Sequence, residues 1–283
     1  MSRRAVGLAA GLWMAAVAAF GFELSEDVRL AIQRDVEAVE EKGPRMGDVM
    51  AALRESGASY LPELTAPLDR DQYQSTYRRR LMTGVYLMDL TYAATFDQRE
   101  PAARFGQALH QMLVDLGFPR PDMERRYREA LAQINLPDGD DRLRQLVKEQ
   151  QENSLWQEQL QSGEGVELVV DGLYGFLIEG LYLTIELCVL SDYDPSSMMY
   201  VAYMRDSFQA YKTLLYRIGE TPELARNIER DQRLSFLTSI RSSWAICPSS
   251  GPNRSIPCAP PSSRPGATFF NKRPRWPPCM NTR

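Results

Sequence analysis

The sequence is short of the residues on which most catalytic and metal sites depend. It has one histidine and four cysteines in 283 residues. Zinc sites need several His or Cys ligands, and a di-iron helical bundle needs Glu-x-x-His motifs on two helices. The chain also has no GxSxG, P-loop or GxGxxG pattern. We therefore predict no metal, no cofactor and no catalytic residue of these kinds.

The histidine and the cysteines that are present have ordinary explanations. His110 lies in QALHQM, where a helix-surface or hydrogen-bonded position is expected. Cys188 lies among Leu187, Val189 and Leu190, which favours a buried structural thiol. The other three cysteines lie beyond residue 246, so they form no framework with Cys188.

Acidic residues are absent after residue 241, and this divides the chain into two unlike parts. Residues 1–241 hold all 37 acids and 27 of the 33 basic residues. Such an acidic body is a poor partner for nucleic acid, whose affinity comes from Lys and Arg on phosphates. Residues 242–283 hold nine Pro, seven Ser and no Leu, a composition that predicts disorder. This tail is either a basic Pro/Ser-rich segment with its own role or the product of a frameshift or misread C-terminus.

The first 21 residues have the layout of a secretory signal peptide. A basic start, residues 1–4, precedes 16 uncharged residues that are too few to span a bilayer. Cleavage is predicted before Phe22, with a second small-residue site before Ala19. No lipidation cysteine is nearby, and the Arg3-Arg4 pair matches a twin-arginine signal only in part. We expect a periplasmic or secreted protein.

The body reads as a series of helices separated by short loops. Apolar spacing, N-cap residues, Gly and Pro predict helices at 25–41, 48–55, 71–96, 101–117, 121–134, 140–161, 165–191, 194–219 and 221–241. A soft point is expected at Gly84, and no run of alternating strands appears. The predicted fold is all-α: an antiparallel helical bundle or stacked helical hairpins, with about eight to nine helices.

The most apolar stretch of the body, residues 165–191, is interrupted by four acids. The longest uncharged run between these acids is seven residues, which predicts a core helix and no membrane span in the mature chain. At 100° per residue, Asp171, Glu179 and Glu186 share one broad side with Tyr182. We expect a central helix whose polar strip reaches solvent or a cleft.

A second candidate group lies in residues 81–96, where Asp89 is the only charge. A buried carboxylate must be hydrogen-bonded, paired or protonated. Tyr86 and Tyr92 lie one helical turn away and could supply hydroxyls, and Arg78 to Arg80 could supply a salt bridge. The Gly84 segment also echoes the Gly180 segment, so the two helices could pack face to face with Asp89 opposite the strip.

Three interpretations of these seven polar residues stay open. They could be a solvated strip or hydrogen-bonding partners of the core, they could line a ligand-binding cleft, or they could act in catalysis. Paired carboxylates suit a hydrolase, and carboxylate oxygens suit Ca²⁺. Their spacing demands neither.

Three segments resemble a group of exported, all-helical bacterial proteins, many of them from Bacteroidetes. Most members of this group are described as uncharacterised lipoproteins or hypothetical proteins. These segments are residues 47–60 (GDVMAALRESGASY), 84–93 (GVYLMDLTYA) and 179–183 (EGLYL), within residues 46–187. The chain departs from the group in lacking the lipidation cysteine, and residues 176–179 (FLIE) replace a tryptophan-containing form. The resemblance implies an exported helical fold and offers no known activity to transfer. It marks Asp89, Tyr92 and Glu179 as positions of interest.

Together these features predict a signal peptide (1–21), a helical domain (22–241) and the tail (242–283). The expected function is a non-enzymatic binding or structural role in the bacterial cell envelope, with an unknown protein or small-molecule partner. One alternative is a carboxylate hydrolase or Ca²⁺-dependent protein that uses Asp89, Glu179 and Glu186. A second alternative is a helical scaffold that binds partner helices.

Overall fold

Every regular element in the described part of the chain is a helix, as the sequence predicts. The computed structural model describes residues 24–43, 45–118, 159–190 and 195–244, together with Trp156 and some single residues between 125 and 145. The elements are α1 (Glu26–Lys42), α2 (Met46–Glu55), η1 (Pro62–Leu64), η2 (Arg70–Gln72), α3 (Thr76–Thr95), α4 (Arg99–Asp115), α7 (Gly163–Leu190), α8 (Pro195–Ile218), α9 (Pro222–Asn227) and α10 (Arg230–Trp244).

The predicted total of about eight to nine helices stays a prediction. The helices expected at 121–134 and 140–161 lie largely outside the described residues, as do the predicted signal peptide and the tail beyond Trp244. The described part therefore confirms the all-α class and leaves the number of helices open.

The long helix predicted at 71–96 is shorter in the structure, because a cap lies inside the predicted range. The Ser75 hydroxyl accepts a hydrogen bond from the Arg78 backbone N–H at 3.2 Å. A serine in this position satisfies one of the free N–H groups at a helix start. The residues before it form η2, and α3 then continues through Gly84 without a break.

The last predicted helix, 221–241, is instead two helices. Glu229 adopts a left-handed backbone conformation with φ of 51°, directly after the buried Ile228. Such a conformation costs a non-glycine residue about 1–2 kcal/mol and ends a right-handed helix. The chain therefore turns between α9 and α10, and α10 packs against α8.

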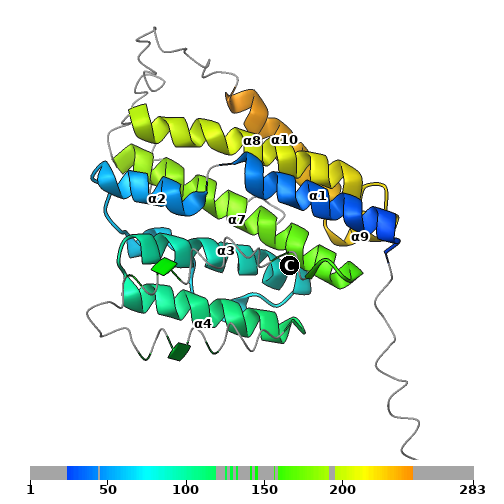
Figure 1. Ribbon diagram of the computed structural model, residues 1–283, viewed down its shortest axis with the longest axis horizontal. Coiled ribbons are helices and arrows are strands. Elements are labelled where there is room, and N and C mark those ends of the chain that lie inside the picture. The colour runs from blue at the N-terminus through cyan, green and yellow to red at the C-terminus, as the bar shows by residue number, and fades with distance from the viewer. Residues whose placement is uncertain are drawn as a thin grey trace, which may run out of the picture.

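α3 and α7 form the centre of the fold and run parallel to each other. Their contact is the most extensive between any two described elements. Arg80 binds Asp171 near one end, and Met88 meets Gly180 farther along both helices. Figure 1 shows α4 on the outer side of α3, and α8 and α1 on the opposite side of α7.

The expected antiparallel arrangement holds for the outer helices. The Tyr211 hydroxyl on α8 donates to the Val170 carbonyl on α7, and Arg217 on α8 pairs with Asp35 on α1. The central α3–α7 pair is a correction to that expectation. It arises because α4 returns the chain to the start of α3, where Arg70 pairs with Asp115 at 2.8 Å. α7 can then begin near the start of α3.

Glycines bring the backbones of α3 and α7 into direct contact. A Cβ on Gly84 would overlap the carbonyl oxygen of Gly172, and a Cβ on Gly175 would overlap that of Leu81. The predicted face-to-face packing of these two helices is therefore confirmed. The two similar glycine segments do not, however, place Gly84 opposite Gly180. A Cβ on Gly180 would instead meet the flexible Met46 side chain at 3.0 Å.

Among the described residues, α7 is long and apolar enough to cross a membrane by length and composition. Its most apolar stretch is 61% buried inside the protein, and a buried core helix meets the same criterion. Cys188 near its end is buried, as the sequence suggested for that thiol.

Candidate functional site

Asp171 lies at the centre of a buried ion network. The Arg80 Nε donates to its Oδ2 at 2.5 Å, and the Arg233 Nη2 donates to its Oδ1. Asp171 and Arg233 are both 0% exposed, and Arg80 is 8% exposed. Both carboxylate oxygens are therefore engaged by guanidinium groups, which is the arrangement that a buried charge requires.

Glu167 extends the network by one turn of α7. The Arg80 Nη1 donates to Glu167 Oε2 at 2.6 Å, and the Asn227 amide donates to Oε1. The Arg80 Nη2 in turn donates to the Asn227 carbonyl at 3.2 Å. Since Asn227 ends α9 and is exposed, the network connects the core of α3 and α7 to the molecular surface.

Tyrosines surround the Arg233 side chain. The guanidinium carbon lies 4.8 Å from the centre of the Tyr174 ring and 5.3 Å from that of Tyr77. The Arg233 Nη1 also donates to the Tyr211 hydroxyl at 2.8 Å. We refer to Tyr77, Asp171, Tyr174 and Tyr211 as the guanidinium cage.

The protonation states in the cage follow from burial and charge. Burial raises the pKa of Tyr77 and of Tyr211 far above the usual tyrosine value; Arg233 acts against that rise, and Asp171 adds to it. Burial acts to lower the pKa of Arg233, but Tyr211, Asp171 and Tyr77 outweigh it and hold that pKa well above its usual value. The cage therefore contains a guanidinium cation beside neutral phenols.

Asp89 is buried, as predicted, and it holds a loop. Its Oδ2 accepts a hydrogen bond from the Ala66 backbone N–H at 2.9 Å. One turn before it, the Tyr86 hydroxyl donates to the Pro67 carbonyl at 2.9 Å. One turn after it, the Tyr92 hydroxyl accepts from the Leu61 N–H at 2.8 Å. Three side chains on one face of α3 thus fix residues 61–67.

The predicted partners of Asp89 need correction. The hydroxyls of Tyr86 and Tyr92 bind the loop backbone, because α3 lies directly beneath residues 61–67. Of the three arginines at 78–80, Arg80 turns toward α7 and binds Asp171 and Glu167. Burial, with a further contribution from the Asp89 charge, raises the pKa of Tyr60 to about 12.

The predicted polar strip on α7 is not open to solvent along its length. Asp171 is 0% and Glu179 is 1% exposed, whereas Tyr182 and Glu186 are half-buried. The reason is that α3, α8 and α2 together cover α7, which the periodicity of one helix cannot show. Desolvation by burial raises the pKa of Glu186.

The hydrogen bond between Asp89 and Ala66 and the contact of the neighbouring Met88 lead to different elements. Asp89 binds the loop at Ala66, and it is the neighbouring Met88 that meets α7, at Gly180. Within the described residues, no group of three or more His, Cys, Asp or Glu is placed to hold a metal ion.

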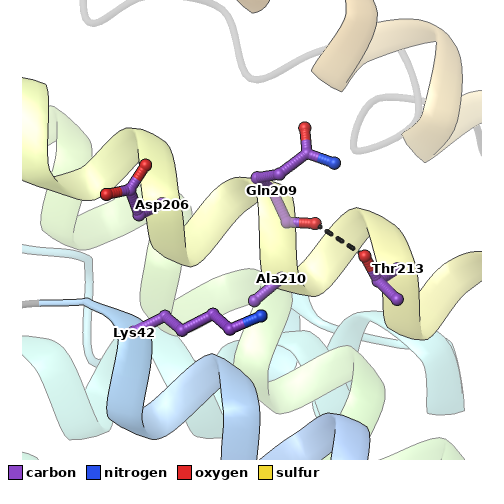
Figure 2. A pocket seen from close by; sticks show the side chains of 5 residues that line it. All are labelled: Lys42, Asp206, Gln209, Ala210 and Thr213. Atoms are coloured by element: carbon purple, nitrogen blue, oxygen red, sulfur yellow. Dashed lines mark hydrogen bonds between the residues drawn. The ribbon is translucent and has the colours of Figure 1, made fainter.

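A surface pocket of about 200 Å³ lies between the end of α1 and α8. It is lined by Lys42, Asp206, Gln209, Ala210 and Thr213. Figure 2 shows the Lys42 side chain lying across from the α8 residues, with the Thr213 hydroxyl bonded to the Gln209 carbonyl. None of these residues belongs to the predicted groups or to the ion network.

The sequence did not indicate Arg233, Asn227, Tyr77, Tyr174 or Tyr211 as functional residues. Arg233 lies four residues before the buried Leu237 and therefore on the apolar side of α10. This helical spacing was the one feature of the sequence that could have indicated a buried arginine. Its acidic partner could not be identified, because 62 residues separate the two.

Comparison with family models, curated proteins and solved structures finds no match to this chain.

Proposed function

We propose that this chain is an exported, non-enzymatic binding or structural protein of the bacterial cell envelope. The observation that carries the proposal is the use of its buried acids. Asp171 is saturated by two arginines, and Asp89 holds the loop at Ala66. Catalytic carboxylates must be able to reach a substrate, and these two serve the fold. The basic and apolar residues 1–21 support export.

The finer organisation belongs to the same proposal. A cleaved segment, residues 1–21, precedes a helical domain of about eight to nine helices, residues 22–241, and a tail, residues 242–283. The resemblance to exported helical proteins of Bacteroidetes supports this arrangement. One of the resembling segments, residues 84–93, contains Asp89 and Tyr92, which bind the loop at residues 61–67.

Export is tested by producing the full chain in a Gram-negative bacterium and sequencing the N-terminus of the periplasmic fraction. The expected mature chain begins at Phe22. Leu12→Arg, which places a charge in the apolar segment, should keep the full-length chain in the cytoplasm. Recovery of uncleaved wild-type chain from the cytoplasm alone would contradict export.

The competing hydrolase or Ca²⁺ role is tested with the same protein. A thermal-shift screen with Ca²⁺ and small ligands compares the wild type with Glu179→Gln and Glu186→Gln. The proposed function predicts that Ca²⁺ leaves all three melting temperatures unchanged. A Ca²⁺-dependent rise in the wild type that both variants lose would support the competing role.

A scaffold that binds partner helices remains the second candidate. Its support is the exposure of Ile185 and Leu190 at the end of α7 and of Met199 near the start of α8, at 41%, 58% and 45%. Substituting all three by Ser should leave the melting temperature nearly unchanged while abolishing capture of a helical partner.

A further inference from the structure

α10 packs on the bundle through apolar side chains that include Leu237, and it also inserts a buried cation, Arg233. Of its side chains at positions 230–238, Arg233 and Leu237 are buried, and Arg233 alone is completely enclosed. Its guanidinium enters the cage formed by Tyr77 of α3, Asp171 and Tyr174 of α7, and Tyr211 of α8. The side chains that bind the Arg233 guanidinium therefore belong to three other helices.

The cage has the chemistry of a receptor for a planar cation. A guanidinium group stacks on aromatic faces and donates in a fixed fork to carboxylate and hydroxyl oxygens. Tyr174 and Tyr77 supply the faces, while Asp171 and Tyr211 supply the acceptors. An ammonium group is a compact point charge and would use this geometry less well.

α10 also contacts the cage through Phe236, whose ring meets Tyr174 edge-on with centroids 6.4 Å apart. The cage has further contacts that do not involve α10. Arg80 binds the other oxygen of Asp171. Tyr211 donates its hydroxyl hydrogen to the Val170 carbonyl at 3.0 Å, and its ring stacks on Tyr174 with centroids 5.7 Å apart. The α3 and α7 backbones meet at Gly84 and Gly172. These contacts do not depend on Arg233, so its withdrawal would leave Asp171 and Tyr211 in position.

We propose that the cage is a recognition site for guanidinium groups, and that Arg233 is its internal occupant. In this account α10 is a displaceable arm, and the ligand class is an arginine side chain presented by another polypeptide. The proposal goes beyond the function proposed above, because it depends neither on export nor on the absence of catalysis.

The test is chemical rescue of Arg233→Ala in the full chain. The variant should melt at a lower temperature than the wild type, and millimolar ethylguanidinium should restore part of the loss by filling the cage. Arg230→Ala is the matched control on the same helix, since Arg230 binds the Leu215 carbonyl and Asp231 outside the cage. Ethylguanidinium should not raise its melting temperature.

Two further comparisons make the rescue specific. Ethylammonium at the same concentration should rescue Arg233→Ala less than ethylguanidinium, and Arg233→Ala combined with Tyr174→Leu should not be rescued. If Arg233→Ala is too unstable to purify, the same additives are compared by refolding yield. Equal rescue by both cations, or no rescue by either, would overturn the proposal.

Displacement is tested in the wild type by hydrogen exchange. N-acetyl-arginine amide, at the concentration at which ethylguanidinium rescues Arg233→Ala, should speed amide exchange in residues 230–244 and leave exchange in α3 unchanged. N-acetyl-lysine amide should have a smaller effect on the same residues. Unchanged exchange in α10 would refute the displaceable arm, even if the cage binds ethylguanidinium.

Discussion

At the scale of single residues, helical spacing identified acidic residues that lie in the core, but it did not identify the residues that bind them. The periodicity of residues 165–191 correctly placed Asp171 on a central helix. The arginines that neutralise it lie 91 residues before it and 62 residues after it. Such pairing depends on the parallel packing of α3 and α7 and on the turn at Glu229, which periodicity within one helix does not specify.

The role of Asp89 gives a prediction at this scale. Asp89→Asn should lower the free energy of unfolding by about 1–3 kcal/mol, because the buried charge-assisted bond to Ala66 weakens and a buried amide donor is introduced. Urea unfolding monitored by circular dichroism measures the change. Asp206→Asn, at an exposed site on α8, is the control and should change little. An unchanged midpoint for Asp89→Asn would count against its role in holding the loop.

Glu186 gives a prediction with pH dependence. Desolvation raises its pKa in the folded state, so the ionised form is disfavoured there relative to the unfolded chain. This costs no stability at a pH below the unfolded pKa, and the cost grows as pH rises through the folded pKa. Glu186→Gln should therefore melt slightly higher than the wild type at pH 7 and equally at pH 3. A higher melting temperature for the variant only at pH 3 would reverse the assigned sign.

At the scale of elements, cap and turn residues predicted most helix ends, and tertiary contact decided the rest. α1, α4, α7 and α8 lie within one or two residues of their predicted bounds. The Ser75 cap that shortens α3 was readable in principle, since Ser precedes a helical run. The left-handed Glu229 was not, because glutamate carries no signal for that conformation.

The α3–α7 crossing predicts opposite outcomes for two glycines of similar local sequence. Gly84→Ala should destabilise the protein by about 3 kcal/mol or more, because the methyl group overlaps the Gly172 carbonyl on a facing backbone. Gly180→Ala should be nearly neutral or stabilising, since the Met46 side chain can move and alanine favours a helix by about 1 kcal/mol.

Thermal unfolding of both variants measures this difference between the two glycines. Equal losses of stability would show that α3 and α7 do not meet at Gly84.

At the scale of the whole molecule, the core contains several tyrosines that resist ionisation. Burial raises the pKa of Tyr60 and Tyr92 to about 12, and it raises those of Tyr77, Tyr86 and Tyr211 further. The neutral form is favoured in the fold, so stability is retained below the unfolded pKa near 10 and is lost as pH rises above it.

Absorbance at 295 nm tests this property of the core. At pH 11 the native protein should show distinctly less tyrosinate than the same protein in 8 M urea, where all 13 tyrosines of the chain are accessible. Equal absorbance in the two solutions, with the protein still folded, would contradict the buried tyrosine core.

The central claim is that Asp171 joins α3, α7 and α10 through its two arginines. The most direct measurement is the free energy of unfolding of Asp171→Asn, alone and combined with Arg233→Met. Loss of one partner from a buried ion pair costs about 3–5 kcal/mol, so the single variant should lose that much. The double variant should recover part of the loss, because no uncompensated guanidinium remains in the cage. A loss below about 1 kcal/mol for Asp171→Asn would contradict the account.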